Sequence, residues 1–278
     1  IFWLASYPKS GNTWIRMFLR SYFLSSSQKF SLNEKGNIDF EFTNFPTPDQ
    51  LKDSNIDHTD FKNIAKNWVT LQDIINLNGK LNFIKTHNGN FNLGNYPFTN
   101  TNNTIGGVYI IRDPRDVVLS TANHFGVDND EATRMLINIE TYEIEDFNES
   151  SKEKYRKSLM GSWSMNYLSW KHYKGRKIHL MKYENLVENP KKNFFKMLEY
   201  INSIVSINID QDKITKAVKE TTFNNLQSLE EKEGFNEVGM GRFFRKGKVG
   251  EWKEKLDPKL VKKIEDHFRK EMMELNYL

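Results

Sequence analysis

The stretch that decides the fold is Tyr7-Pro8-Lys9-Ser10-Gly11-Asn12-Thr13-Trp14. It is preceded by the apolar run Ile1–Ser6 and followed by apolar residues that recur at helical spacing as far as Phe23. This pattern predicts a buried strand, a tight turn and a helix. A strand that runs through a short polar turn into a helix is typical of parallel α/β folds.

The polar turn predicts an anion-binding loop. Gly11 permits a tight backbone path, and the N–H groups that begin the helix point at any anion held there. Lys9 and the hydroxyls of Ser10 and Thr13 add further donors. The turn is not a Walker A loop, because its lysine precedes the glycine. The alternative is a structural connection that merely contains a lysine.

The rest of the chain also alternates short apolar runs with longer helical patterns. This predicts an α/β fold, one domain over residues 1–278, with a central parallel sheet flanked by helices. The expected core strands are Ile1–Ser6, Leu81–Lys85, Val108–Ile111 and Ile178–Lys182. Helices are expected after the first strand, after Pro114, and over Glu131–Phe147, Ser158–Lys174, Lys191–Ile201 and Lys259–Leu275, with a long loop over Asn88–Thr104.

A basic cluster follows the strand expected over Val108–Ile111. It reads Arg112-Asp113-Pro114-Arg115-Asp116, and Ser120 lies further along the helix that should begin at the proline. Arg112 can hold a phosphate through two parallel hydrogen bonds, and Ser120 can donate to another oxygen of it. The alternative is a plain ion pair between Arg112 and Asp116 at the start of the helix.

The strand expected over Leu81–Lys85 ends in Lys85-Thr86-His87. Ligands of open α/β sheets bind beyond the carboxyl ends of the strands, so His87 should face the same crevice as Lys9. A histidine there is the natural candidate for a general base, since it titrates close to working pH. No histidine and carboxylate spacing resembles a metal-binding motif, and no metal site is expected.

Cations gather around two glycines late in the chain, in the stretch from Phe244 to Lys253. The stretch predicts a loop that wraps a phosphate, with the glycines allowing close backbone approach. The competing interpretation is a solvated basic turn or a nucleic-acid patch. No recognition-helix pattern accompanies it, so nucleic acid is the weaker candidate.

Composition excludes several classes of protein. With 278 residues, 38% of them hydrophobic and 27% charged, the chain can bury a sizeable core as a soluble globular protein. A net charge of +4 is too small to indicate wholesale nucleic-acid binding. The absence of cysteine excludes a disulfide scaffold, a cysteine-ligated zinc site and a cysteine nucleophile, and fits a cytoplasmic protein. No apolar run approaches the ~18 residues of a membrane span.

Taken together, these motifs resemble the soluble, cytosolic-type sulfotransferase family. The resemblance runs from Tyr7 to Lys253 and rests on six elements in family order. They are Pro-Lys-Ser-Gly-x-Thr-Trp, Lys-Thr-His, Arg-x-Pro-x-Asp-Val-x-x-Ser, Lys182–Glu184, Thr221–Phe223 and Arg-Lys-Gly-x-x-Gly-x-Trp-Lys. Each element alone is weak, but their order is highly specific. Asn12 replaces the threonine commonest at its position, and its backbone N–H is retained.

The resemblance implies the P-loop-like, nucleoside-kinase-like fold of sulfotransferases and transfer of a sulfuryl group from 3′-phosphoadenosine 5′-phosphosulfate (PAPS), leaving 3′-phosphoadenosine 5′-phosphate (PAP). It assigns the 5′-phosphosulfate to Lys9, Ser10, Gly11, Asn12, Thr13 and Trp14, and the 3′-phosphate to Arg112, Ser120, Arg245, Lys246 and Gly247. It places the adenine between Trp14 and Phe223, near Tyr183, Thr221 and Thr222.

The same resemblance implies metal-independent chemistry. His87 removes the proton of the acceptor, Lys9 neutralises the leaving oxygen and Lys85 supports the sulfuryl oxygens. The acceptor is expected to be a hydroxyl or amine of a small or carrier-tethered molecule. The family's dimerisation pattern is not evident over Lys253–Lys263, which leaves monomer and homodimer open. The alternatives are a P-loop small-molecule kinase and a non-catalytic module that binds anions or nucleic acid.

Overall fold

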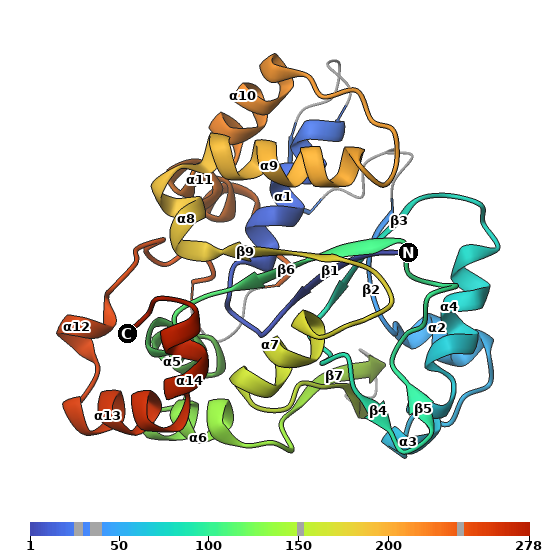
Figure 1. Ribbon diagram of the computed structural model, residues 1–278, viewed down its shortest axis with the longest axis horizontal. Helices are drawn as coiled ribbons and strands as arrows, with labels where there is room; N and C mark the ends of the chain where they lie inside the picture. Colours follow the sequence, from blue (N-terminus) through green and yellow to red (C-terminus); the bar gives the residue numbers. More distant parts are fainter. Residues whose placement is uncertain (25–29, 34–40, 149–152, 238–241) are drawn as a thin grey trace. The chain divides into compact units, whose positions relative to one another are not determined.

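The computed structural model describes residues 1–24, 30–33, 41–148, 153–237 and 242–278. The chain has an α/β fold, with a central sheet in the strand order β2-β3-β1-β6-β9 (Figure 1). It forms two compact units. Within the described residues, no helix is long and apolar enough to cross a membrane.

The first unit comprises Ile1–Tyr7, Asp39–Tyr109 and Asn138–Leu180. Its sheet contains β1 (Phe2–Ser6), β2 (Glu41–Asn44) and β3 (Asn82–Thr86), in which β3 pairs in parallel with both others. The strands β6 (Gly106–Ile111) and β9 (Ile178–Lys182) begin in this unit and continue into the second. Parallel pairing brings the carboxyl ends of β1 and β3, and therefore Ser6 and His87, to the same edge.

Helices and two antiparallel hairpins complete the first unit. They are α2 (Pro48–Asp53), α3 (Phe61–Lys66), α4 (Trp68–Asn76) and α7 (Trp163–Lys171), with the hairpins β4 (Asn92–Leu93)–β5 (Tyr96–Pro97) and β7 (Tyr142–Asn148)–β8 (Glu153–Leu159). Aromatic rings fill the core: Phe98 lies 5.1 Å from Trp3, 5.3 Å from Trp68 and 6.0 Å from Trp170, measured between ring centroids. Burying such large rings supplies much of the hydrophobic stabilisation of the unit.

The second unit comprises Pro8–Ile38, Ile110–Ile137 and Met181–Leu278. Its helices are α1 (Asn12–Phe23), α5 (Pro114–Phe125), α6 (Asn129–Ile137), α8 (Tyr183–Glu188), α9 (Pro190–Asn202), α10 (Gln211–Glu220), α11 (Phe223–Glu233), α12 (Trp252–Lys255), α13 (Pro258–His267) and α14 (Arg269–Glu274). Helices α9 and α10 lie beside α1, and α13 lies beside α5 and α6 (Figure 1). The stacked rings of Phe18 and Phe194, 3.8 Å apart, join α1 to α9.

The four expected core strands are confirmed, and so are the helices after the first strand, after Pro114 and over Lys191–Ile201. The helix expected over Glu131–Phe147 is wrong in its second half, because α6 ends at Ile137 and β7 follows. Polar and apolar residues alternate from Tyr142, which is the period of a strand. The helix expected over Ser158–Lys174 begins only at Trp163, where the Ser162 hydroxyl accepts a hydrogen bond from the Met165 N–H.

Two further expectations need correction. The loop expected over Asn88–Thr104 contains the short β4–β5 hairpin, and the helix expected over Lys259–Leu275 is divided at Phe268 into α13 and α14. The edge strand β2 was not predicted. None of these differences alters the turn between β1 and α1.

That turn requires glycine for two separate reasons. The φ angle of Gly11 is 108°, in the region that L side chains rarely adopt. A Cβ atom there would lie 2.7 Å from Cδ2 of Tyr183 and 3.0 Å from Cδ1 of Ile110. The ring of Tyr183 therefore packs against the bare backbone of the turn.

We predict that Gly11→Ala lowers the free energy of unfolding by about 1–2 kcal/mol through its φ angle and by about 1–3 kcal/mol more through the collision with Tyr183. Gly79→Ala is the matched control, because Gly79 has φ 67° and nothing within 4 Å of a built Cβ. Urea unfolding of both variants measures the difference. Equal losses in the two variants would contradict the packing argument.

Candidate active site

The loop between β1 and α1 carries donors of the kind that an anion needs. Lys9 itself has a positive φ of 63°, and its ammonium lies 4.0 Å from the centroid of the Phe243 ring. The hydroxyl of Ser10 is fully buried and has no hydrogen-bond partner among the described residues. A buried hydroxyl without a partner is costly, and an oxygen-rich ligand would satisfy it.

Arg112 joins three of the predicted motifs. Its guanidinium donates to the carbonyl oxygen of Lys9 over 3.3 Å and to that of Lys248 over 3.2 Å. The same group lies 4.4 Å above the ring of Tyr183. The anion-binding loop, the end of β6 and the glycine-containing stretch Phe244–Lys253 (the glycine loop) are therefore connected through Arg112.

Carboxylates hold the segments on either side of Arg112. Asp116 is buried on α5 and accepts hydrogen bonds from the N–H groups of Gly250, over 2.7 Å, and Trp252, over 3.0 Å. Glu184 accepts from the N–H of Asp113 over 2.9 Å. Burial raises the pKa of both carboxyls, and the neighbouring Arg112 opposes that change at Asp116. Asp116 thus fastens the glycine loop to α5.

The two aromatic residues expected to flank an adenine pack against the same apolar cluster. Trp14 and Phe223 both pack at the margin of an apolar core that contains Met17 and Leu226. A Cβ added to Gly247 would lie 2.3 Å from Cδ2 of Phe223, so the backbone of the glycine loop passes directly over that ring. No larger residue fits at this place.

The threonines next to Phe223 serve the backbone. Thr221 is fully buried, and its hydroxyl donates to the carbonyl oxygen of Ala217 over 2.7 Å. The hydroxyl of Thr222 donates to the carbonyl oxygen of Lys219 over 3.2 Å. Both hydroxyls therefore satisfy carbonyl groups near the end of α10, just before Phe223 begins α11.

Three cations surround a single carboxylate in the glycine loop. Arg245 donates to both oxygens of Glu251, and the ammonium groups of Lys246 and Lys255 lie 2.7 and 3.1 Å from its Oε1. The hydrogen bonds from Arg245 are the main reason that the pKa of Glu251 falls to about 2. One negative charge among three positive ones leaves a surplus, which suits a doubly charged phosphate.

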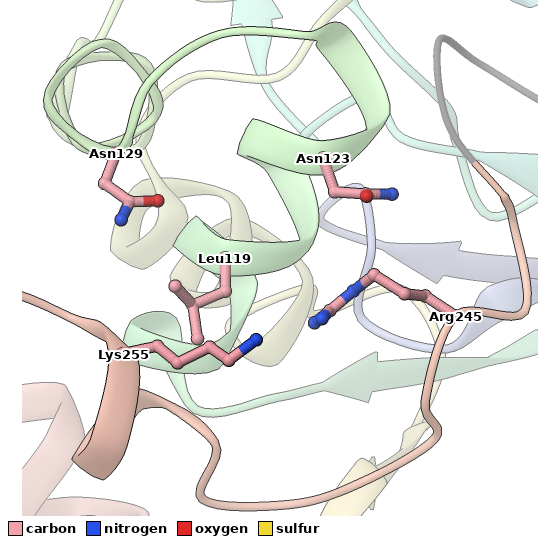
Figure 2. A pocket seen from close by; sticks show the side chains of 5 residues that line it. All are labelled: Leu119, Asn123, Asn129, Arg245 and Lys255. Carbon is pink, nitrogen blue, oxygen red and sulfur yellow. The ribbon is translucent and has the colours of Figure 1, made fainter.

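A cavity of about 310 Å³ opens beside this cluster and is lined by Leu119, Asn123, Asn129, Arg245 and Lys255. Figure 2 shows the charged ends of Arg245 and Lys255 pointing toward one another next to α5. Ser120 lies on the same helix. The sequence analysis missed Asn123, Asn129 and Lys255, although Asn123 lies three residues after Ser120 and thus near it on the helix surface.

The hydroxyl of Thr13 contacts two side chains of the second unit. It donates to Glu237 over 3.2 Å and accepts from Arg16, which also contacts Glu237 over 2.6 Å. Neither Arg16 nor Glu237 was predicted. Asn12 accepts from Arg16 over 3.1 Å, so both loop side chains are held by the same guanidinium.

His87 is held in the first unit by its ring and its backbone. Its Nδ1 donates to the carbonyl oxygen of Ser6 over 2.8 Å, since a carbonyl can only accept. The lone pair of the neutral ring is therefore on Nε2, which makes that atom the basic one. The carbonyl oxygen of His87 accepts from Asn166 over 2.9 Å, and Trp170 donates to that of Asn88.

Lys85, on β3, has a carboxylate neighbour that the sequence analysis did not identify. Its ammonium lies 3.8 Å from Oε1 of Glu143, on β7. The residues expected to bind the nucleotide all belong to the second unit, whereas Lys85 and His87 belong to the first. The convergence of His87 and Lys9 stays a prediction. Searched within the described ranges, no three His, Asp or Glu side chains gather as a metal site.

Comparison with known proteins gives the family. The model of the sulfotransferase domain matches residues 2–276. Flavonol 4′-sulfotransferase of Flaveria chlorifolia is 27% identical over 94% of this chain and 76% of its own length. The rabbit amine sulfotransferase is 25% identical over 62% of this chain and 56% of its own length.

Solved structures agree on the fold. The mouse sulfotransferase SULT7A1, solved as a complex with PAP, superposes with a TM-score of 0.59 at 20% identity, over 98% of this chain and 83% of its own. Retinol dehydratase, solved with androsterone and PAP, gives a TM-score of 0.53 at 15% identity, over 98% of this chain and 80% of its own. The predicted α/β fold and the predicted family are both confirmed, and this chain belongs to the sulfotransferase family.

Proposed function

We propose that this sulfotransferase transfers a sulfuryl group from PAPS to a hydroxyl or amine of a small or carrier-tethered acceptor. We assign both units to one sulfotransferase domain, an assignment supported by the family match over residues 2–276. The observation that carries the proposal is Arg112, whose guanidinium joins the anion-binding loop, the glycine loop and Tyr183.

The residues present fit a nucleotide with phosphates at both ends. Lys9 to Trp14 would hold the 5′-phosphosulfate, and the unsatisfied Ser10 hydroxyl supports this assignment. Arg112, Ser120 and Arg245–Gly247 would hold the 3′-phosphate, and the positive surplus around Glu251 supports that one. Trp14, Tyr183 and Phe223 would contact the adenine, with Thr221 and Thr222 as the backbone support of Phe223.

The chemistry needs a base and charge neutralisation. PAPS supplies the sulfuryl group. In this proposal Nε2 of His87 takes the acceptor's proton as the acceptor's oxygen or nitrogen bonds to sulfur and the sulfur–oxygen bond to the nucleotide breaks. Lys9 neutralises the oxygen that leaves, and Lys85 balances the charge on the sulfuryl oxygens. Positioned cations can perform both tasks, and we propose a reaction that requires no metal.

The names of the relatives support proposals for the acceptor and for the cellular compartment. Two relatives are named as flavonol and amine sulfotransferases, which supports a small hydroxyl or amine acceptor here. Others are named cytosolic sulfotransferases, and the chain lacks cysteine, so we place the enzyme in the cytoplasm.

A thermal-shift titration tests the nucleotide. PAP at about 100 times its dissociation constant should stabilise the folded protein by about 2.7 kcal/mol, whereas ATP with Mg²⁺ and oligonucleotides should not. Arg112→Ala should lose most of the shift. Arg134→Ala is the control, since Arg134 is an exposed arginine of the same unit that pairs with Glu131. Stabilisation by ATP with Mg²⁺ alone would favour a kinase instead.

We predict that His87→Ala lowers kcat by about 10²- to 10⁴-fold and leaves PAP affinity unchanged, because the variant removes a base and no proposed nucleotide contact. Single-turnover transfer and PAP titration measure the two quantities. His172→Ala, at the end of α7, serves as the control. Substantial residual turnover in His87→Ala would count against the role of His87 as base.

We predict that Asp116→Asn weakens PAP binding about tenfold, because an amide cannot accept hydrogen bonds from both Gly250 and Trp252 at its two ends. The glycine loop then loses part of its attachment to α5. Calorimetric titration measures the effect, with Asp266→Asn as an exposed control in the same unit. Equal affinities in the two variants would remove Asp116 from the support of the site.

A further inference from the structure

The hairpin β7–β8 brings a carboxylate to the pair Lys85 and His87. Glu143, on β7, lies in register with Ser158, on β8, and its Oε1 is 3.8 Å from the ammonium of Lys85. The two side chains are only 23% and 14% exposed. In such a partly buried place an ion pair is screened less than at the surface.

The charges that face Glu143 come from two strands of the first unit. Lys85 lies on β3 and His87 follows it by two residues, the spacing that places strand side chains on the same face, and Lys157 lies on β8. Burial alone would raise the pKa of the Glu143 carboxyl, but these three groups outweigh it, Lys85 most strongly, and the pKa falls to about 2. Tyr155 also faces the carboxylate, and its phenol is neutral because burial raises its pKa. Glu143 is therefore an anion throughout the working pH range.

The second carboxylate of the hairpin is engaged elsewhere. Glu145 forms an ion pair with Lys157, so the ammonium of Lys157 is held by Glu145. Glu145 is 39% exposed, so Glu143 is the more enclosed of the two. The ion pair of Glu143 is with Lys85 instead.

Electrostatic coupling between two titratable groups is reciprocal. If a charged His87 stabilises the Glu143 anion, then that anion must stabilise the charged form of His87 by the same free energy. We propose that Glu143 is a positioning residue, which holds the ammonium of Lys85 and favours the proton that His87 receives at Nε2. This inference rests on the proposed function, in which His87 is the base and Lys85 faces the sulfuryl oxygens.

Glu143 would affect sulfuryl transfer through the positive charge that His87 gains during the reaction. A base that gains a positive charge in a partly buried site is helped by a fixed anion nearby. An ion pair with Glu143 restricts the position of the Lys85 ammonium, which in the proposed function faces the sulfuryl oxygens. Removing the charge of Glu143 should therefore slow the chemical step and leave acceptor binding largely intact.

Histidine NMR tests the coupling without turnover. The imidazole signal of His87, assigned by its loss in His87→Asn, is titrated in the wild type, in Glu143→Gln and in Glu153→Gln. Glu153 is the matched control, because it lies on the same hairpin and pairs with His58 instead. The titration midpoint of His87 should fall by about one pH unit in Glu143→Gln and stay unchanged in Glu153→Gln.

Enzyme kinetics then test whether the coupling between Glu143 and His87 affects catalysis. In Glu143→Gln we expect kcat to fall about ten- to a hundredfold with little change in KM, and the acid limb of the kcat/KM profile to move to lower pH. Glu143→Asp, which keeps the charge, should recover much of the rate. Thermal melts show whether each variant is folded.

The outcomes separate this inference from the proposed function. An unchanged His87 midpoint in folded Glu143→Gln overturns the inference, whether or not the enzyme is a His87-based transferase. A shifted midpoint with an unchanged pH–rate profile supports the coupling and removes His87 as the base. A loss confined to KM overturns the positioning role and makes Glu143 an acceptor contact.

Discussion

The arrangement of the second unit depends on the segment at the start of α5, where Arg112 donates hydrogen bonds to the backbone and Asp116 accepts them. The guanidinium donates to carbonyl oxygens of the anion-binding loop and the glycine loop, and the carboxylate accepts from N–H groups of the glycine loop. These hydrogen bonds connect the anion-binding loop and the glycine loop to the segment Arg112–Asp116. An Arg112–Asp116 ion pair alone would have bound neither loop.

Two enclosed carboxylates show the same electrostatic pattern. Glu251 lies among Arg245, Lys246 and Lys255, and Glu143 faces Lys85, His87 and Lys157. In each cluster the cations lower the pKa of the carboxyl to about 2, so the anion persists at neutral pH. Around Glu251 positive charge exceeds negative charge, which leaves net charge for an anionic ligand, whereas Glu143 and Glu145 together balance Lys85 and Lys157.

The sequence predicted those parts of the molecule in which a residue type has a single structural role. Apolar runs gave the four core strands, and a glycine between lysine and helix gave the turn at Gly11. The β7–β8 hairpin was missed because its strands are rich in glutamate and lysine, which favour helices, and only their alternation indicates a strand. The hydroxyl of Thr221 donates to the carbonyl oxygen of Ala217, a contact that its motif did not indicate.

Contacts between residues that are far apart in the chain could not be predicted from such sequence motifs. Glu143 belongs to none of the six motifs, and nothing in its neighbourhood marks it as the partner of Lys85. Pairing of that kind depends on the register of a hairpin, and a shift by one residue would turn the carboxylate to the other face. In the proposed mechanism the motifs supply the groups that bind the nucleotide, whereas the hairpin register sets which carboxylate faces Lys85. A change in such a hairpin would then alter the reaction while every motif residue stays in place.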